Sequence, residues 1–144
     1  MLFVSRGILT PILNLYDKSM YCFKSDKFQI INNEDSQTNP GIYGLEFAKW
    51  LKEELIKSGY KIQDVTPEDW GWCITIKTDS AFWLCVACRG EYYDTDLVWS
   101  CFIEAKKSIW RNPFKKIDTT QSLQNLDENL KEILSKNFSL IECF

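Results

Sequence analysis

The chain has 144 residues, 15% of them aromatic, and a formal net charge of −3, which fits one ordered domain over residues 1–144. The acidic balance excludes a basic footprint for nucleic acid or for an anionic membrane surface, and it favours partners with a basic surface. Because the chain has no histidine, histidine metal sites and nucleophiles that depend on a histidine base are excluded, and any enzyme hypothesis has to use carboxylates, Lys, Tyr or Cys.

The first half of the chain predicts a strand and then a helix. Residues 1–19 are either an extension or an additional strand or helix, because Met20 would also be a sensible start. Residues 21–32 are rich enough in aromatic and β-branched side chains for a strand or hairpin, and 32–41 form a polar loop. The stretch "IYGLEFAKWLKEELIKSGY" has apolar residues at helical spacing and ends at Ser58-Gly59, which predicts an amphipathic helix.

The second half predicts a run of strands, a helix and a short closing strand over 138–144. The helix extends from about Thr120 to Asn137, where leucines recur at helical spacing. The expected strands are Tyr60–Val65, Trp70–Lys77, Ala81–Arg89 and Leu97–Glu104, with a turn over 78–80. This order predicts an α+β fold, an antiparallel sheet of four to six strands with two helices packed on one face.

Alternation along the strands divides the sheet into two faces. One assignment places these residues against the helices: Trp72, Ile74, Ile76, Leu84, Val86 and Phe102. The other face then carries Cys73, Thr75, Trp83, Cys85, Ala87, Trp99 and Cys101. Such an apolar face is either covered by the N-terminal segment and the long loops, or it is an interface with a partner or with a second copy.

The six cysteines are expected to be reduced thiols that bind no metal, and no cofactor is expected. The N-terminus does not resemble an export signal and no apolar run is long enough to span a membrane, so we expect a cytoplasmic protein. Cys85 and Cys88 form a Cys-x-x-Cys pair, which is compatible with a redox pair or half of a zinc site. Within a strand, however, the two side chains point to opposite faces, which favours structural cysteines.

Two stretches combine acidic and aromatic residues. In "TPEDWGW", Trp70 and Trp72 are expected to be core anchors, while Glu68 and Asp69 remain in solvent, where they cap backbone amides or meet a partner. "EYYDTDLVW" is either an ordinary hairpin loop or a recognition patch with aromatic anchors and acidic steering groups. The candidate partner-binding residues are Trp83, Trp99, Tyr92, Tyr93, Asp94, Asp96, Glu68 and Asp69, and no catalytic residue is assigned.

Tyr43-Gly44 before the helix, Gly59-Tyr60 at its end and "EDWGW" over 68–72 together resemble a family of small bacterial proteins, over roughly residues 41–104. The resemblance implies a cytosolic α+β domain of the kind that serves as an immunity protein against interbacterial toxins, and it brings no catalytic residue. The leading hypothesis is therefore a non-catalytic protein-binding domain that neutralises a toxin, and a basic toxin domain is the candidate partner. The alternatives are a carboxylate-based enzyme, a small-ligand-binding protein and a homodimeric scaffold.

Overall fold

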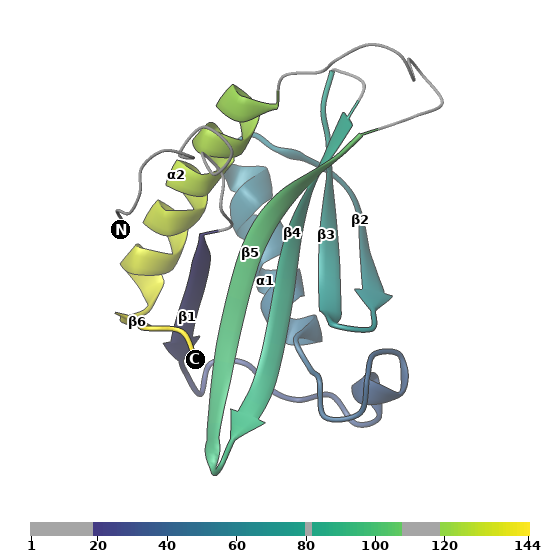
Figure 1. Ribbon diagram of the computed structural model, residues 1–144, viewed down its shortest axis with the longest axis vertical. Helices are drawn as coiled ribbons and strands as arrows, with labels where there is room; N and C mark the ends of the chain where they lie inside the picture. Colours follow the sequence, from purple (N-terminus) through teal and green to yellow (C-terminus); the bar gives the residue numbers. More distant parts are fainter. Residues whose placement is uncertain (1–18, 80–81, 108–118) are drawn as a thin grey trace, which may run out of the picture.

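The computed structural model describes residues 19–79, 82–107 and 119–144 (Figure 1). Residues 1–18, which hold nearly all of the predicted N-terminal extension, and part of the predicted turn at 78–80 lie outside the described residues. The elements in chain order are β1 Met20–Lys24, a 3-10 turn η2 Glu34–Ser36, α1 Leu45–Lys57, β2 Lys61–Glu68, β3 Gly71–Lys77, β4 Phe82–Tyr93, β5 Asp96–Lys107, α2 Thr120–Asn137 and β6 Leu140–Ile141.

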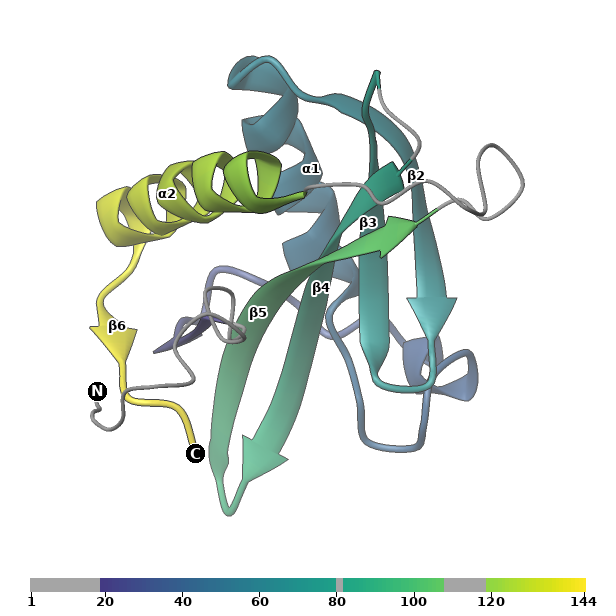
Figure 2. The same ribbon diagram turned by 45° about the horizontal axis from the view of Figure 1, so that its top comes forward.

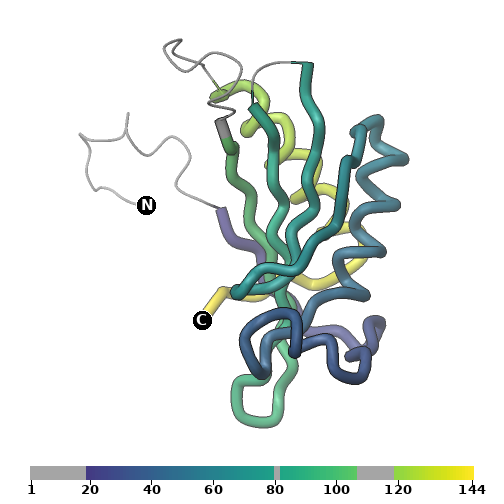
Figure 3. The backbone as a smooth tube through the Cα atoms, turned by 90° about the vertical axis from the view of Figure 1, so that its right-hand side faces the viewer, coloured from purple at the N-terminus to yellow at the C-terminus, as the bar shows by residue number. Residues whose placement is uncertain are grey.

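The strands form one six-stranded sheet in the order β2-β3-β4-β5-β1-β6, and every neighbouring pair is antiparallel. Both helices lie on the same side of this sheet (Figure 3). Helix α1 contacts β2, β3 and β4, whereas α2 contacts β5, so the helices divide the sheet between them (Figure 2). The predicted α+β fold with two helices on one face is therefore confirmed.

Helical spacing of apolar residues determines which side of each helix is buried. Phe47, Ala48, Leu51 and Leu55 of α1 point into the core, and α2 adds a similar stripe at Leu123, Leu126, Leu130, Ile133 and Leu134. Trp72, Ile74 and Ile76 of β3 meet them from the sheet. The predicted strand over 21–32 is shorter than expected, because β1 ends at Lys24 and a loop follows it.

The predicted faces of β5 are reversed. Trp99, Cys101 and Ile103 point to the helices, because Trp99 pairs with Gly90 and Ile103 with Val86, whereas Phe102 lies on the opposite face beside Ala87. The indole N–H of Trp99 donates to the carbonyl oxygen of Ser25 at 3.1 Å. Both faces of this strand carry apolar residues, so alternation alone could not assign the direction of each side chain.

Trp70 is likewise not a core anchor. It lies in the turn between β2 and β3, and its ring centroid is 6.0 Å from that of Phe102, on the face away from the helices. Gly71, with a φ of +148°, follows it and breaks the strand alternation that would have placed Trp70 beside Trp72. Trp72 itself is buried in the core, as predicted.

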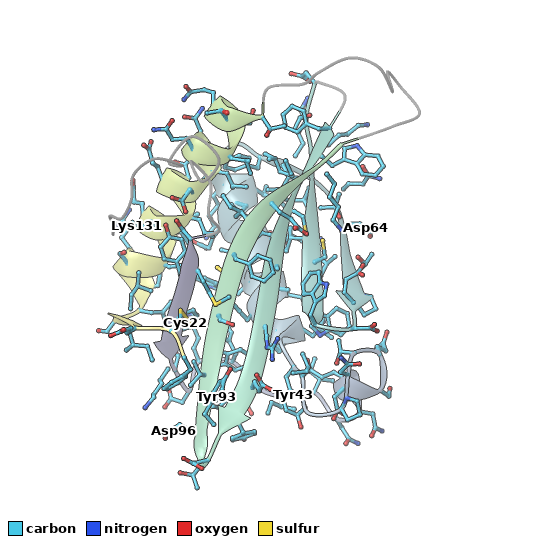
Figure 4. The ribbon with its side chains drawn as sticks, viewed as in Figure 1. Cys22, Tyr43, Asp64, Tyr93, Asp96 and Lys131 are labelled. Carbon is cyan, nitrogen blue, oxygen red and sulfur yellow. A yellow bond between two sulfur atoms is a disulfide. The ribbon has the colours of Figure 1, made fainter. Side chains whose placement is uncertain are left out.

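The expectation that all six cysteines are reduced is wrong, because Cys22 and Cys143 form a disulfide. Cys22 lies in β1 opposite Ile141 of β6, so the sheet brings the C-terminal segment beside it, with the two Cα atoms 5.3 Å apart (Figure 4). Their separation of 121 residues gave no local signal in the sequence. The free cysteines are Cys73, Cys85, Cys88 and Cys101, all buried. Of the helices described, neither has the length and apolarity needed to cross a membrane.

Candidate binding surface

The face of the sheet that points away from the helices, here called the open face, is crossed by one continuous stripe along β4. Every second residue of β4 contributes to it: Trp83, Cys85, Ala87, Arg89, Glu91 and Tyr93. Phe102 of β5 and Met20 of β1 pair beside the stripe. No helix among residues 19–79, 82–107 and 119–144 covers this face (Figure 3).

Exposure on the open face is concentrated in a few large side chains. Trp83 is 42% exposed and Met20 is 48% exposed, whereas Cys73, Cys85 and Ala87 between them are buried. Trp83 therefore lies at the end of a strip of small buried residues, and its cross-strand neighbours are Lys77 of β3 and Lys106 of β5. An exposed indole beside such a strip is typical of a binding surface, since the ring can be desolvated without any rearrangement of the strands.

A cavity of about 250 Å³ lies beside Trp83, at the end of the open face near β2. Its polar lining comes from three strands: Asp64, Thr66 and Glu68 of β2, Cys73 and Thr75 of β3, and Lys106 of β5. Glu68 and Trp83, both among the candidates, thus line one cavity, Trp83 from the Lys77 end of β3 and Glu68 from the Gly71 end. Asp64 and Lys106 were not among the candidates, because single charged residues in strands carry no sequence signal.

Two thiols line the bottom of this cavity. Cys73 Sγ lies 3.7 Å from the hydroxyl oxygen of Thr75, and Cys85 is a cavity residue on the adjacent strand. A hydrogen bond from the Cys85 thiol lowers the pKa of Cys73, and the same hydrogen bond, together with burial, raises the pKa of Cys85. In the core, burial raises the pKa of both Cys88 and Cys101.

The Cys-x-x-Cys pair is divided between the two faces of the sheet. Cys85 lies on the open face, and Cys88 pairs with Cys101 in the core, so the two side chains do not converge. This confirms the interpretation drawn from strand alternation. Over the described ranges, His, Cys, Asp and Glu nowhere gather in a group of three or more that could hold a metal ion.

The remaining aromatic candidates cluster at the tip of the β4–β5 hairpin, which projects past the ends of β2 and β3 (Figure 1). Tyr92 and Tyr93 are exposed there, and Tyr93 packs against Phe144 with ring centroids 4.7 Å apart. Asp94 has a φ of +58° in the turn. Asp96 forms an ion pair with Lys24, with 2.9 Å between the ammonium nitrogen and the carboxylate oxygen. Because Lys24 partly compensates the charge of Asp96, the charge of Asp94 contributes more to the negative potential of the hairpin tip.

A short polar chain joins the hairpin tip to the open face. The Tyr93 hydroxyl donates to Glu91 Oε1 at 3.0 Å, and the guanidinium of Arg89 pairs with the same carboxylate. Burial, followed by the Glu91 hydrogen bond and charge, raises the pKa of Tyr93. These contacts fix the directions of the Arg89 and Tyr93 side chains on the stripe. Tyr93 is labelled near the hairpin tip in Figure 4.

The structure separates the predicted binding residues into three groups. Trp83 lies at one end of the stripe, and Tyr92, Tyr93, Asp94 and Asp96 lie at the other, roughly 33 Å away at 3.3 Å per residue. Glu68 and Asp69 lie between them, at the β2–β3 turn, because Glu68 pairs with Gly71, which lies beside Arg89 of β4. Trp99 belongs to none of these groups. It is 0% exposed beneath Phe28 and Phe47, so its assignment as a binding anchor is wrong.

Asp69 is exposed in the β2–β3 turn, where its backbone carbonyl accepts a hydrogen bond from Asn39 N–H at 2.9 Å. Its contact with the loop after β1 is therefore made by the backbone, and the carboxylate is left in solvent. Comparison of the chain with protein-family models, curated proteins and solved structures finds no match.

Proposed function

We propose that this protein is a non-catalytic protein-binding domain that docks its partner on the open face, along the β4 stripe. The observation that carries the proposal is the exposed indole of Trp83 at the end of a strip of small buried residues, on a face that no described helix covers. Buried aromatic anchors supply most of the energy of a typical protein interface. Trp83 is positioned to be such an anchor.

The length of the stripe suits a protein better than a small molecule. A standard interface buries about 800 Å² on each partner, enough to span roughly 30 Å, which matches the distance from Trp83 to the hairpin tip. Trp83 lies at one end and the exposed Tyr93 at the other, whereas Tyr92 points to the opposite face of the hairpin, toward Tyr43. A single partner of ordinary size can therefore contact both aromatic groups.

The charges at the hairpin tip and on the β2 side of the open face favour a basic partner. Asp94 and Asp96 lie exposed at the tip, and Asp64 and Glu68 line the cavity from β2, whereas Lys77 and Lys106 flank Trp83 itself. Acids at the edge of an interface mainly accelerate encounter with a basic protein. The EDWGW resemblance makes the specific form of the proposal an immunity-type protein that neutralises a bacterial toxin by direct binding.

The proposal includes the cytoplasmic location that the sequence led us to expect. That location sets a requirement on the disulfide. Disulfides are rare in that compartment, so the chain has to fold there with Cys22 and Cys143 reduced. An immunity protein that works outside the cytoplasm would keep the bond. Stability with and without the bond is therefore informative about location.

The experiment is co-expression with each product of the genes that neighbour this chain's gene, to find a toxin among them. We expect this protein to restore growth of cells that express the toxin and to co-elute with it at a fixed ratio. Neutralising Asp94 and Asp96 together should slow association and weaken its dependence on salt, with less change in dissociation. If neither co-elution nor growth protection is found with any neighbouring product, the immunity form of the proposal fails.

A second candidate function is supported by the cavity beside Trp83, because two carboxylates, Asp64 and Glu68, line it together with the indole. This arrangement favours a small polar ligand or carboxylate chemistry. Replacement of Asp64 by Asn and Glu68 by Gln separates the two functions, because protein binding anchored by Trp83 should survive it. A homodimer would instead be revealed by sedimentation of the purified chain alone, through a mass that depends on concentration.

A further inference from the structure

We infer that Cys73 is a reactive thiol that exchanges with small disulfides entering the cavity beside Trp83. This inference stands apart from the protein-binding proposal, since it rests on the cavity and on the thiol pair that lines it. Cys73 and Cys85 come from adjacent strands and both face the same space of about 250 Å³. The other free thiols, Cys88 and Cys101, lie in the core on the opposite side of the sheet.

The surroundings of Cys73 stabilise its thiolate. The Cys85 thiol donates a hydrogen bond to it, and the hydroxyl of Thr75 is 3.7 Å from its sulfur. The Lys106 ammonium also lowers the pKa of Cys73, while burial and the charge of Glu68 oppose the shift. The thiolate is the nucleophilic form of cysteine, so these contacts favour Cys73 over the core thiols, whose pKa values burial raises.

The reaction is an ordinary thiol–disulfide exchange. The Cys73 thiolate attacks one sulfur of a small disulfide R–S–S–R, a Cys73–S–S–R bond forms and the original S–S bond breaks. The leaving R–S⁻ takes a proton from solvent. Cys73 is oxidised and one sulfur of the small disulfide is reduced, so no further oxidant is needed. In this step Cys85 is a positioning residue, acting through its hydrogen bond to Cys73.

The charges around the cavity determine which disulfides enter it most readily. The charged groups that line the cavity are Asp64 and Glu68 from β2 and Lys106 from β5. Two carboxylates against one ammonium make the site acidic. We therefore expect a cationic aminothiol disulfide such as cystamine to react faster than an anionic one such as dithiodiglycolate, with a difference that shrinks in high salt.

The first experiment labels the folded, disulfide-intact chain with iodoacetamide and maps the adducts by peptide mass spectrometry. Cys73 should label at least about tenfold faster than Cys88 or Cys101, with a pH midpoint below the ordinary thiol value of about 8.5. Cys88 and Cys101 are the internal references, so no variant is needed. Labelling of Cys73 no faster than these core thiols would overturn the inference.

The second experiment tests the role of Cys85 and the preferred disulfide. Cys85→Ala should move the pH midpoint of Cys73 labelling upward, whereas Cys85→Ser, which keeps a donor, should move it less; a merely structural role would leave the midpoint unchanged. Cystamine should give a mixed disulfide on Cys73 several-fold faster than dithiodiglycolate, by electrostatic attraction. Equal rates for the two disulfides, or an unchanged midpoint in Cys85→Ala, would contradict the inference.

Discussion

Oε1 of Glu34 accepts a hydrogen bond from the backbone N–H of Gly44 at 2.9 Å, so a buried side chain from the preceding loop caps helix α1. The same oxygen accepts from Leu45 N–H at 3.0 Å, and Oε2 accepts from Ile31 N–H at 2.7 Å. Gly44, at the N-cap, has no side chain that could do this. The carboxylate also lies at the N-terminal end of the helix, where unpaired backbone N–H groups need acceptors.

Glu34→Gln should destabilise the protein by about 1–3 kcal/mol, because an amide replaces one acceptor oxygen with a donor that faces another N–H group. The measurement is a urea unfolding curve. Glu46→Gln is the matched control, since Glu46 lies in the first turn of the same helix without these contacts. A loss for Glu34→Gln no larger than the control's would mean that the buried carboxylate is not needed as a cap.

Gly90→Ala should destabilise by about 1–3 kcal/mol through overpacking. A Cβ at Gly90 would lie 2.5 Å from the six-membered ring of Trp99. The cost should be smaller when the substitution is made in a Trp99→Leu background, because the ring that it strikes is then absent. Thermal or urea unfolding of the four proteins of this cycle gives the coupling, and strictly additive effects would contradict the packing described for this pair.

Breaking the Cys22–Cys143 bond should lower stability by about 2–5 kcal/mol, because the bond restricts the unfolded chain across a loop of more than a hundred residues. Unfolding is compared with and without reductant. Cys143→Ser should have the stability of the reduced wild type and should not respond to reductant. If the unfolding midpoint of the wild type is the same with and without reductant, the bond contributes nothing to stability. Folding in the cytoplasm would then not depend on whether Cys22 and Cys143 are bonded.

Trp72 and Trp83 should respond in opposite ways to truncation. Trp72→Ala should cost about 3–5 kcal/mol, since its ring is buried against the helices, whereas Trp83→Ala should cost less than about 1 kcal/mol. Urea unfolding of both variants checks this. If Trp83→Ala proves as damaging as Trp72→Ala, the indole of Trp83 is part of the core and the open face is closed.

The fold could be predicted because its signals are local. The stripe of leucines defined α2 over Thr120–Asn137, and alternation in β3 placed Trp72, Ile74 and Ile76 in the core. Features that depend on contacts distant in sequence were missed. Glu34 looked like one more polar loop residue, although it reaches ten residues ahead to Gly44.

The candidate site was predicted in part, for the same reason. Trp83 is exposed as the binding hypothesis requires, whereas Trp99 is buried, because in β5 both faces are apolar and only the pairing with Gly90 decides which way the indole points. The thiols of Cys73 and Cys85 were correctly placed on one face. Their shared cavity could not be read from the sequence, since it also needs Asp64 from β2 and Lys106 from β5.

The central claim is that Trp83 anchors a protein partner on the open face, and the most direct test is the dissociation constant of that complex for two variants. Ile56→Ala is the matched control, because Ile56 is 43% exposed, close to the 42% of Trp83, but lies on helix α1. We predict that Trp83→Ala weakens binding by about 2 kcal/mol or more, roughly thirtyfold, mostly through faster dissociation. Ile56→Ala should bind like the wild type. Unchanged affinity in Trp83→Ala, with a loss in Ile56→Ala, would place the interface on the helices and contradict the account.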